Sequence, residues 1–216
     1  MSRLSERDAS AVRWRRPRDP AWDSLWGSVE AGAGGPGSAE PNAPRPNAPR
    51  RPNEPAAGSS DPQMRLIVRT DGAARGNPGP ASLGAVLIDV SSPGSRRPDA
   101  APLASISEYL GVQTNNVAEY TAVLRALALA GELGAREVEM LLDSKLIVEQ
   151  LHGRWRVKDA KLIPLHAEAK AHLARFARWS ATHVPRAQNH QADALCNEAI
   201  DRVQTGGPPV VVVRPK

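Results

Sequence analysis

Residues 65–90, RLIVRTDGAARGNPGPASLGAVLIDV, decide the fold of this chain. They hold two apolar runs, 65–70 and 83–90, on either side of a segment rich in Gly and Pro, a pattern typical of two strands joined by a turn. A third run of the same kind follows at 103–110. Because the connections are short, we expect the three strands to pair antiparallel as a meander.

The chain beyond the meander alternates between helical and strand patterns. Residues 115–133 place apolar side chains on one helical face, and Gly134 follows as a C-terminal stop. Further elements complete the series: a strand at 137–142, helices at 144–152 and 162–176, a strand at 179–184 and a helix at 190–203. Helices between successive strands imply parallel pairing. The sequence therefore predicts an α/β fold with a five-stranded mixed sheet, three antiparallel strands extended by two parallel ones, flanked by helices.

The N-terminal part of the chain has a different composition. Pro and Gly dominate from residue 27 to residue 62, so this stretch cannot bury enough apolar surface to offset the entropy of ordering. Residues 19–30 carry Trp and Leu at helical spacing. This pattern suits a short amphipathic helix that docks on a protein or nucleic-acid partner or on the domain itself. The alternative is a mostly disordered tail with no specific role, because so short a helix is marginal in water. We expect three parts: a disordered extension at 1–63, a folded domain at 64–204 and a C-terminal tail at 205–216.

The composition of the whole chain excludes several classes of protein. With 216 residues, 41% of them hydrophobic, the chain is long enough for one ordinary domain core. Its 28 Lys and Arg against 23 Asp and Glu give a net charge of +5, which favours a polyanionic partner. The single cysteine, Cys196, permits no internal disulfide, and no stretch reaches the roughly 20 apolar residues of a membrane span. Because no apolar segment follows Arg15 and Arg16, we reject an export signal. We expect a cytoplasmic protein that is a monomer and has no membrane contact.

Four acidic residues stand at the ends of expected elements. Asp71 and Asp143 follow apolar strands, whereas Glu119 and Asp193 lie in the first turns of helices. Each alone has an ordinary explanation as a turn-capping or surface acid. Together, four converging carboxylates would repel one another unless hard, oxygen-seeking cations bind among them. If the first and fourth strands are adjacent and parallel, Asp71 and Asp143 lie side by side.

Four segments carry a resemblance to a known family: TDGAARGNPGPA, TNNVAEYTAVLRAL, LLDSKLIVEQL and HVPRAQNHQADALCNEA. In their order and spacing they resemble type 1 ribonuclease H, and the resemblance extends from Met64 to Arg202. It implies the ribonuclease H-like fold, and an endonuclease that cuts the RNA strand of RNA/DNA hybrids to leave 5′-phosphate and 3′-hydroxyl ends. It also implies the catalytic residues: the carboxylates Asp71, Glu119, Asp143 and Asp193, and His183 at the position of the family's loop histidine.

The resemblance implies a metal cofactor as well. Two Mg²⁺ ions, with Mn²⁺ as a substitute, would be held by the four carboxylates, and Asp71 would bridge them. His183 would move protons or help to release product rather than bind metal. A structural histidine on a loop is the competing interpretation.

Several further positions match substrate contacts of the family. Gly72, Asn77 and Asn115 correspond to positions that approach the minor groove of the hybrid, where the 2′-hydroxyl distinguishes RNA. Thr114 and Asn116 correspond to positions near the DNA strand. Asn and Thr side chains also cap turns and helices, which is the alternative explanation.

The region around the third helix departs from the better-known bacterial members. Lys145 stands where many relatives carry a glutamine that contacts the RNA. The segment 153–161, GRWRVKDAK, is short and lacks a long basic protrusion. Trp155, Arg156 and Lys158 are candidates to replace it through stacking and phosphate contacts, and a core tryptophan with solvated charges is the alternative.

Two other functions compete with cleavage of hybrids. One is a nucleic-acid-binding module that has kept the fold and lost catalysis, and the other is a nuclease of the same fold that acts on double-stranded RNA. Loss of one carboxylate would have favoured the binding module, but all four are present.

Overall fold

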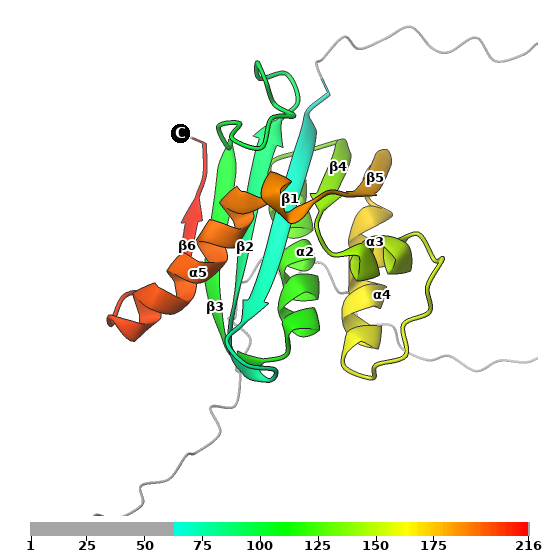
Figure 1. Ribbon diagram of the computed structural model, residues 1–216. Helices are drawn as coiled ribbons and strands as arrows, with labels where there is room; N and C mark the ends of the chain where they lie inside the picture. Colours follow the sequence, from blue (N-terminus) through cyan, green and yellow to red (C-terminus); the bar gives the residue numbers. More distant parts are fainter. Residues whose placement is uncertain (1–62, 216) are drawn as a thin grey trace, which may run out of the picture. The chain divides into compact units, whose positions relative to one another are not determined.

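The computed structural model describes residues 63–215, and Figure 1 labels the helices and strands. The expected N-terminal extension, except for residue 63, lies outside the described residues. In chain order the elements are β1 (Arg65–Ala74), β2 (Gly79–Asp89), β3 (Ala104–Gln113), α2 (Asn115–Glu132), β4 (Glu137–Leu142), α3 (Lys145–Leu151), α4 (Leu162–Leu173), β5 (Arg178–His183), the 3-10 turn η1 (Arg186–Gln188), α5 (His190–Gln204) and β6 (Val210–Val213).

The strands form one mixed sheet in the order β5-β4-β1-β2-β3-β6. Antiparallel pairing joins β1 to β2 and β2 to β3, as the meander predicted. Parallel pairing joins β1 to β4 and β4 to β5. The α/β class and the mixed sheet are therefore confirmed.

The expected count of five strands is wrong, because the sheet has six. The sixth strand, β6, comes from the segment expected to be a C-terminal tail. Its four valines pair antiparallel with β3, from Ser105 opposite Val213 to Glu108 opposite Val210. Four β-branched residues suit a strand well, but a run this short behind two prolines gives a weak pattern.

The first strand is longer than its apolar run. The pairing of β1 with β2 continues past Thr70 through Asp71 opposite Gly84 as far as Ala74 opposite Ala81. The turn is thereby confined to the few residues between the two strands. Asp71 consequently lies inside a strand, not at its end, with residues paired to β2 before and after it.

The two faces of the sheet carry different helices (Figure 1). α2 packs on β1, β2 and β3 on one face, with α3 and α4 beside it, and α5 packs on the same three strands from the other. Because side chains alternate along a strand, Leu66 and Val68 belong to the large core under α2, whereas Ile67 belongs to a small cluster with Val86 and Leu195. We call these sides the α2 face and the α5 face. Within residues 63–215, no helix has both the length and the apolarity to span a bilayer.

Candidate active site

Two of the predicted carboxylates meet through strand register. The parallel pairing of β1 with β4 sets Val68 beside Met140. Three residues farther along the chain come Asp71, still in β1, and Asp143, directly after the end of β4. Asp71 is buried and Asp143 half-buried, as the parallel arrangement of these strands led us to expect.

A close approach of backbones brings Glu119 to the same place. A Cβ atom at Gly72 would lie 2.1 Å from the backbone nitrogen of Glu119, so α2 rests directly on β1. The side-chain amide of Asn115 donates a hydrogen bond of 2.9 Å to Oε1 of Glu119. Gly72 is thus needed for packing, because no larger residue fits between the strand and the first turn of α2.

A second close approach brings in Asp193 from the α5 face. A Cβ atom at Gly84 would lie 2.1 Å from the carbonyl oxygen of Ala192, so α5 lies directly on β2. Asp193 follows in the first turn of α5 and forms an ion pair with the Arg186 guanidinium. Since Gly84 pairs with Asp71 across the two strands, this contact holds Asp193 next to Asp71.

Burial and the charges of the other three carboxylates act on Asp71. Burial raises the pKa of Asp71 to about 7, and the negative charges of Asp143, Asp193 and Glu119 contribute to the rise. Arg186 opposes the shift. Burial also raises the pKa of Glu119. The ionised form of Asp71 is therefore unfavourable at neutral pH unless a cation lies nearby.

Unpartnered oxygens mark where a cation fits. Oδ2 of Asp71 and Oε2 of Glu119 are buried and accept no hydrogen bond from the part of the chain that the structure describes. Carboxylate oxygens are the ligands that Mg²⁺ and Mn²⁺ prefer. No three His, Cys, Asp or Glu side chains within residues 63–215 are arranged to hold a metal ion by themselves. The donor set nevertheless suits a hard divalent cation.

Asn189 is a site residue that the sequence did not reveal. It is 1% exposed, and its amide nitrogen donates to the carbonyl oxygen of Thr70 and to Oδ1 of Asp143, both at 2.8 Å. It thereby holds the carboxylate of Asp143 in place beside β1. From the sequence alone, an Asn before a helix is expected to be an ordinary helix cap. Its contacts with residues distant in sequence produce no local sequence pattern.

Arg186, not His183, contacts the carboxylates. His183 is the exposed last residue of β5, paired in register with Leu142, and so lies within the strand expected at 179–184. None of the hydrogen bonds and ion pairs described for the four carboxylates involves His183. The segment from β5 to α5 is short, and η1 turns it back so that Arg186 reaches Asp193. The cationic side chain that the structure sets against the cluster is therefore an arginine.

The expected contacts for the hybrid gather at the start of α2. Oδ1 of Asn77 accepts a hydrogen bond of 3.2 Å from the backbone nitrogen of Asn115, which itself holds Glu119. Thr114 caps the helix by accepting from the backbone nitrogen of Val117. Asn116 is exposed next to them. The turn after β1 and the start of α2 thus form one polar surface beside Glu119.

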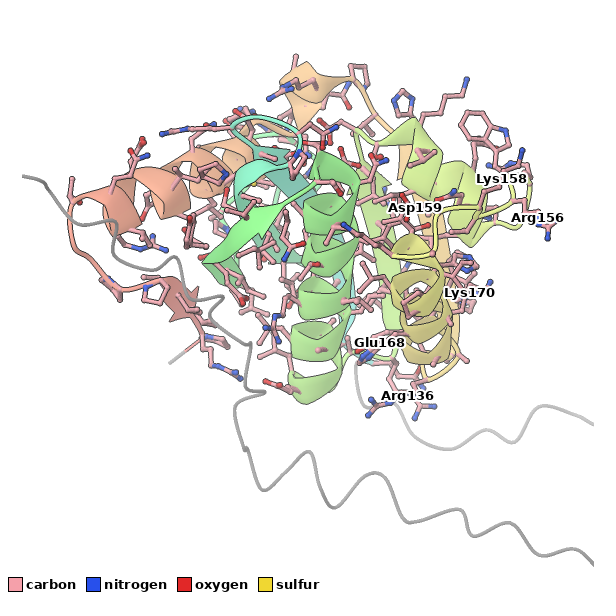
Figure 2. All side chains as sticks on the ribbon, turned by 90° about the horizontal axis from the view of Figure 1, so that it is seen from below. Arg136, Arg156, Lys158, Asp159, Glu168 and Lys170 are labelled. Carbon is pink, nitrogen blue, oxygen red and sulfur yellow. The ribbon has the colours of Figure 1, made fainter. Side chains whose placement is uncertain are left out.

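The remaining candidates lie on and after α3. Lys145 is the exposed first residue of α3. Figure 2 shows Arg156 and Lys158 on the loop before α4, pointing away from the ribbon. Trp155 on the same loop is 45% exposed and so is not a core tryptophan. The structure describes no hydrogen bond or ion pair between these residues and the four carboxylates.

Comparisons with known proteins identify the family of this chain. The family model described as reverse transcriptase-like matches residues 69–199. Ribonuclease HI of Halobacterium salinarum is 44% identical over 137 residues, which cover 63% of this chain and 65% of that protein. A bifunctional protein of Mycobacterium tuberculosis is 43% identical over 138 residues, 64% of this chain but 36% of its own length. The crystal structure of LC11-RNase H1 in complex with an RNA/DNA hybrid is 39% identical with a TM-score of 0.58, and the match covers 64% of this chain and 99% of that one.

Proposed function

The chain belongs to the reverse transcriptase-like family in its ribonuclease H branch, and from this premise we propose that it is a divalent-metal-dependent endonuclease that cuts the RNA strand of RNA/DNA hybrids. One observation carries the proposal: burial and the charges of three acidic side chains raise the pKa of Asp71, whose Oδ2 has no partner in the described residues. Burial of such a group is costly unless a cation binds there. The matched LC11-RNase H1 structure contains an RNA/DNA hybrid, which supports a hybrid as the substrate of this chain.

The four carboxylates would hold two Mg²⁺ ions, with Mn²⁺ as a substitute. When bound, such ions activate a water and neutralise charge at the phosphate, which leaves 5′-phosphate and 3′-hydroxyl ends. The chain's own part is to hold the ligands still. Asn189 fixes Asp143, and Asn115 fixes Glu119. Arg186 offsets part of the negative charge through its ion pair with Asp193, and its long exposed side chain can release that carboxylate.

Selection of the RNA strand is assigned to the polar surface at the start of α2. Asn77, Asn115 and Asn116 offer amide groups that can donate to and accept from a 2′-hydroxyl. They adjoin Glu119 through the hydrogen bonds of Asn115. Trp155, Arg156 and Lys158 would grip the hybrid farther away, because exposed cations release counterions from phosphates and an exposed ring can stack.

The decisive experiment is cleavage of labelled RNA/DNA hybrid, double-stranded RNA and double-stranded DNA in Mg²⁺ and in Mn²⁺. We expect cleavage of the hybrid alone. Asp71→Asn should lower kcat by about 10³-fold or more while hybrid binding remains, because the side chain keeps its shape but loses its charge. Asp99→Asn is the matched control, since Asp99 is an exposed acid paired with Arg97, and its kcat should equal that of wild type.

The alternatives make different predictions in the same assay. Cleavage of double-stranded RNA in preference to the hybrid would identify the chain as a duplex-RNA nuclease of the same fold. Tight hybrid binding without cleavage in either metal would identify a binding module. Wild-type turnover by Asp71→Asn would contradict the role of the carboxylates.

A further inference from the structure

Arg69 is buried in the middle of β1, two residues before Asp71. Its exposed fraction is 1%, and its neighbour on the α5 face is Ile67, which is fully buried. Burying a guanidinium among apolar side chains is costly unless its hydrogen bonds are satisfied. The carboxylate ligands and the polar surface beside Glu119 do not account for an arginine here.

The Arg69 guanidinium connects two segments that are distant in sequence. One terminal nitrogen donates to the carbonyl oxygen of Gln188 at 2.6 Å, and the other donates to the carbonyl oxygen of Arg96 at 3.1 Å. Burial lowers the pKa of Arg69, and the negative charge of Glu139 partly opposes this. Since both acceptors are backbone carbonyls, the contacts depend on where these segments run and not on their side chains.

The turn held by Arg69 carries two groups of the active site. Arg186 begins η1 and Asn189 follows it, so the carbonyl of Gln188 lies between the residue that pairs with Asp193 and the one that holds Asp143. No residue of η1 is buried. Its internal hydrogen bonds run from Gln188 to Pro185 and from Asn189 to Arg186. Packing therefore does little to fix this turn, and the hydrogen bond from Arg69 to Gln188 holds it against the sheet.

We propose that Arg69 is a positioning residue that locks η1 against the sheet and thereby sets Arg186 and Asn189 against the carboxylates. The proposal rests on the proposed nuclease function. An arginine suits this role because its planar guanidinium reaches two carbonyls at once, whereas a lysine amine is a single point donor. In the sequence of β1, Arg69 is the charged residue that interrupts the apolar run.

The test compares Arg69→Met and Arg69→Lys with wild type. Arg69→Met should lower kcat about 10- to 100-fold, because small misplacements of a catalytic group have large effects. KM for the hybrid should change by less than about two-fold, and more Mg²⁺ should be needed for half-maximal rate, since Asn189 no longer holds Asp143 firmly. Arg69→Lys should recover part of kcat. Arg96→Ala is the matched control, because it removes an exposed side chain and keeps the carbonyl that Arg69 uses.

Amide hydrogen exchange gives a readout that is independent of activity. In Arg69→Met, and to a smaller extent in Arg69→Lys, the amides of Gln188 and Asn189 should exchange faster than in wild type, while those of Leu66 and Val86 stay protected. If Arg69→Met does not fold, the kcat and the amide exchange of Arg69→Lys test the proposal. A purely structural arginine would lower the melting temperature and leave kcat and the Mg²⁺ requirement of the folded fraction unchanged.

A double-mutant cycle shows whether Arg69 acts through the turn. Asn189→Ala should lower kcat, and adding Arg69→Met should lower it little further, because both changes release the same group. Fully additive losses, or wild-type kcat in folded Arg69→Met, would overturn the proposal and leave the nuclease function intact. Failure of the proposed function would be distinct, because wild type itself would then not cleave the hybrid.

Discussion

The α2 face and the α5 face of the sheet are stabilised in different ways. Under α2, buried apolar side chains such as Leu66, Leu83 and Leu127 form one large core. Under α5 the apolar cluster is small, and polar contacts carry much of the interface: the hydroxyl of Ser82 donates to the carbonyl of Cys196, and the thiol of Cys196 donates to the carbonyl of Asp71. Hydrogen bonds are directional and contribute little net stability, whereas apolar burial is strong and non-directional. We infer that the α2 face provides most of the stability of the domain, whereas the α5 face positions the active-site groups.

The largest expected effect is at Gly72, where the two roles meet. Gly72→Ala places a methyl group 2.1 Å from the backbone nitrogen of Glu119, so α2 must move away from β1. We expect a loss of more than about 4 kcal/mol in unfolding free energy together with loss of cleavage. Urea denaturation and hybrid cleavage measure the two effects. Gly131→Ala is the control, because nothing lies within 4 Å of its Cβ position in α2, and it should be neutral or stabilising by up to about 1 kcal/mol.

Leu127→Ala tests the α2 face alone. Leu127 is fully buried in the core under α2, and truncation to alanine should cost about 2–5 kcal/mol in urea denaturation. Well below the melting temperature, kcat of the folded protein should stay near that of wild type. A kcat that falls in parallel with the unfolding free energy would contradict the inference that the two faces have separate roles.

Asp71→Asn should separate stability from activity on the α5 face. A carboxyl whose pKa rises from 3.8 to about 7 on folding binds a proton in the folded state between these pH values, so wild type loses stability as pH rises through this window. The asparagine variant lacks this loss. In EDTA it should be more stable than wild type at pH 8, by at most about 4 kcal/mol, and the advantage should shrink toward pH 4. Thermal melts across this range measure it, and a variant less stable than wild type at pH 8 would contradict the prediction.

The smallest effect is expected for the polar contacts behind the active site. The hydroxyl of Ser107 donates to the carbonyl of Leu195 at 2.9 Å and accepts from Arg202 at 3.0 Å. Ser107→Ala should cost about 1 kcal/mol in urea denaturation and leave kcat unchanged. A loss as large as that of Leu127→Ala would show that the α5 face also carries much of the stability.

The sequence predicted those features that depend on local patterns. The start of α2 was predictable because Thr114 is a good cap before an apolar helical repeat, and Asp143 because it follows an apolar strand. Strand β6 was not, since its partner in β3 lies about a hundred residues earlier. Arg69 and Asn189 were also missed, because their backbone and side-chain partners are more than a hundred residues away or in another element. Local periodicity carries no trace of such contacts.

The central position of β1 has a consequence for how the active site forms during folding. Its pairing with β2 closes a short loop, but its pairing with β4 joins Arg65 to Glu137 across the whole meander and α2. Short-range pairs form faster than long-range ones, because closing a longer loop costs more entropy. The meander can therefore assemble early with Asp71 alone, and Asp143 joins it only when β4 docks. A growing or partly folded chain consequently lacks the complete set of four carboxylates, and the proposed active site becomes complete only late in folding.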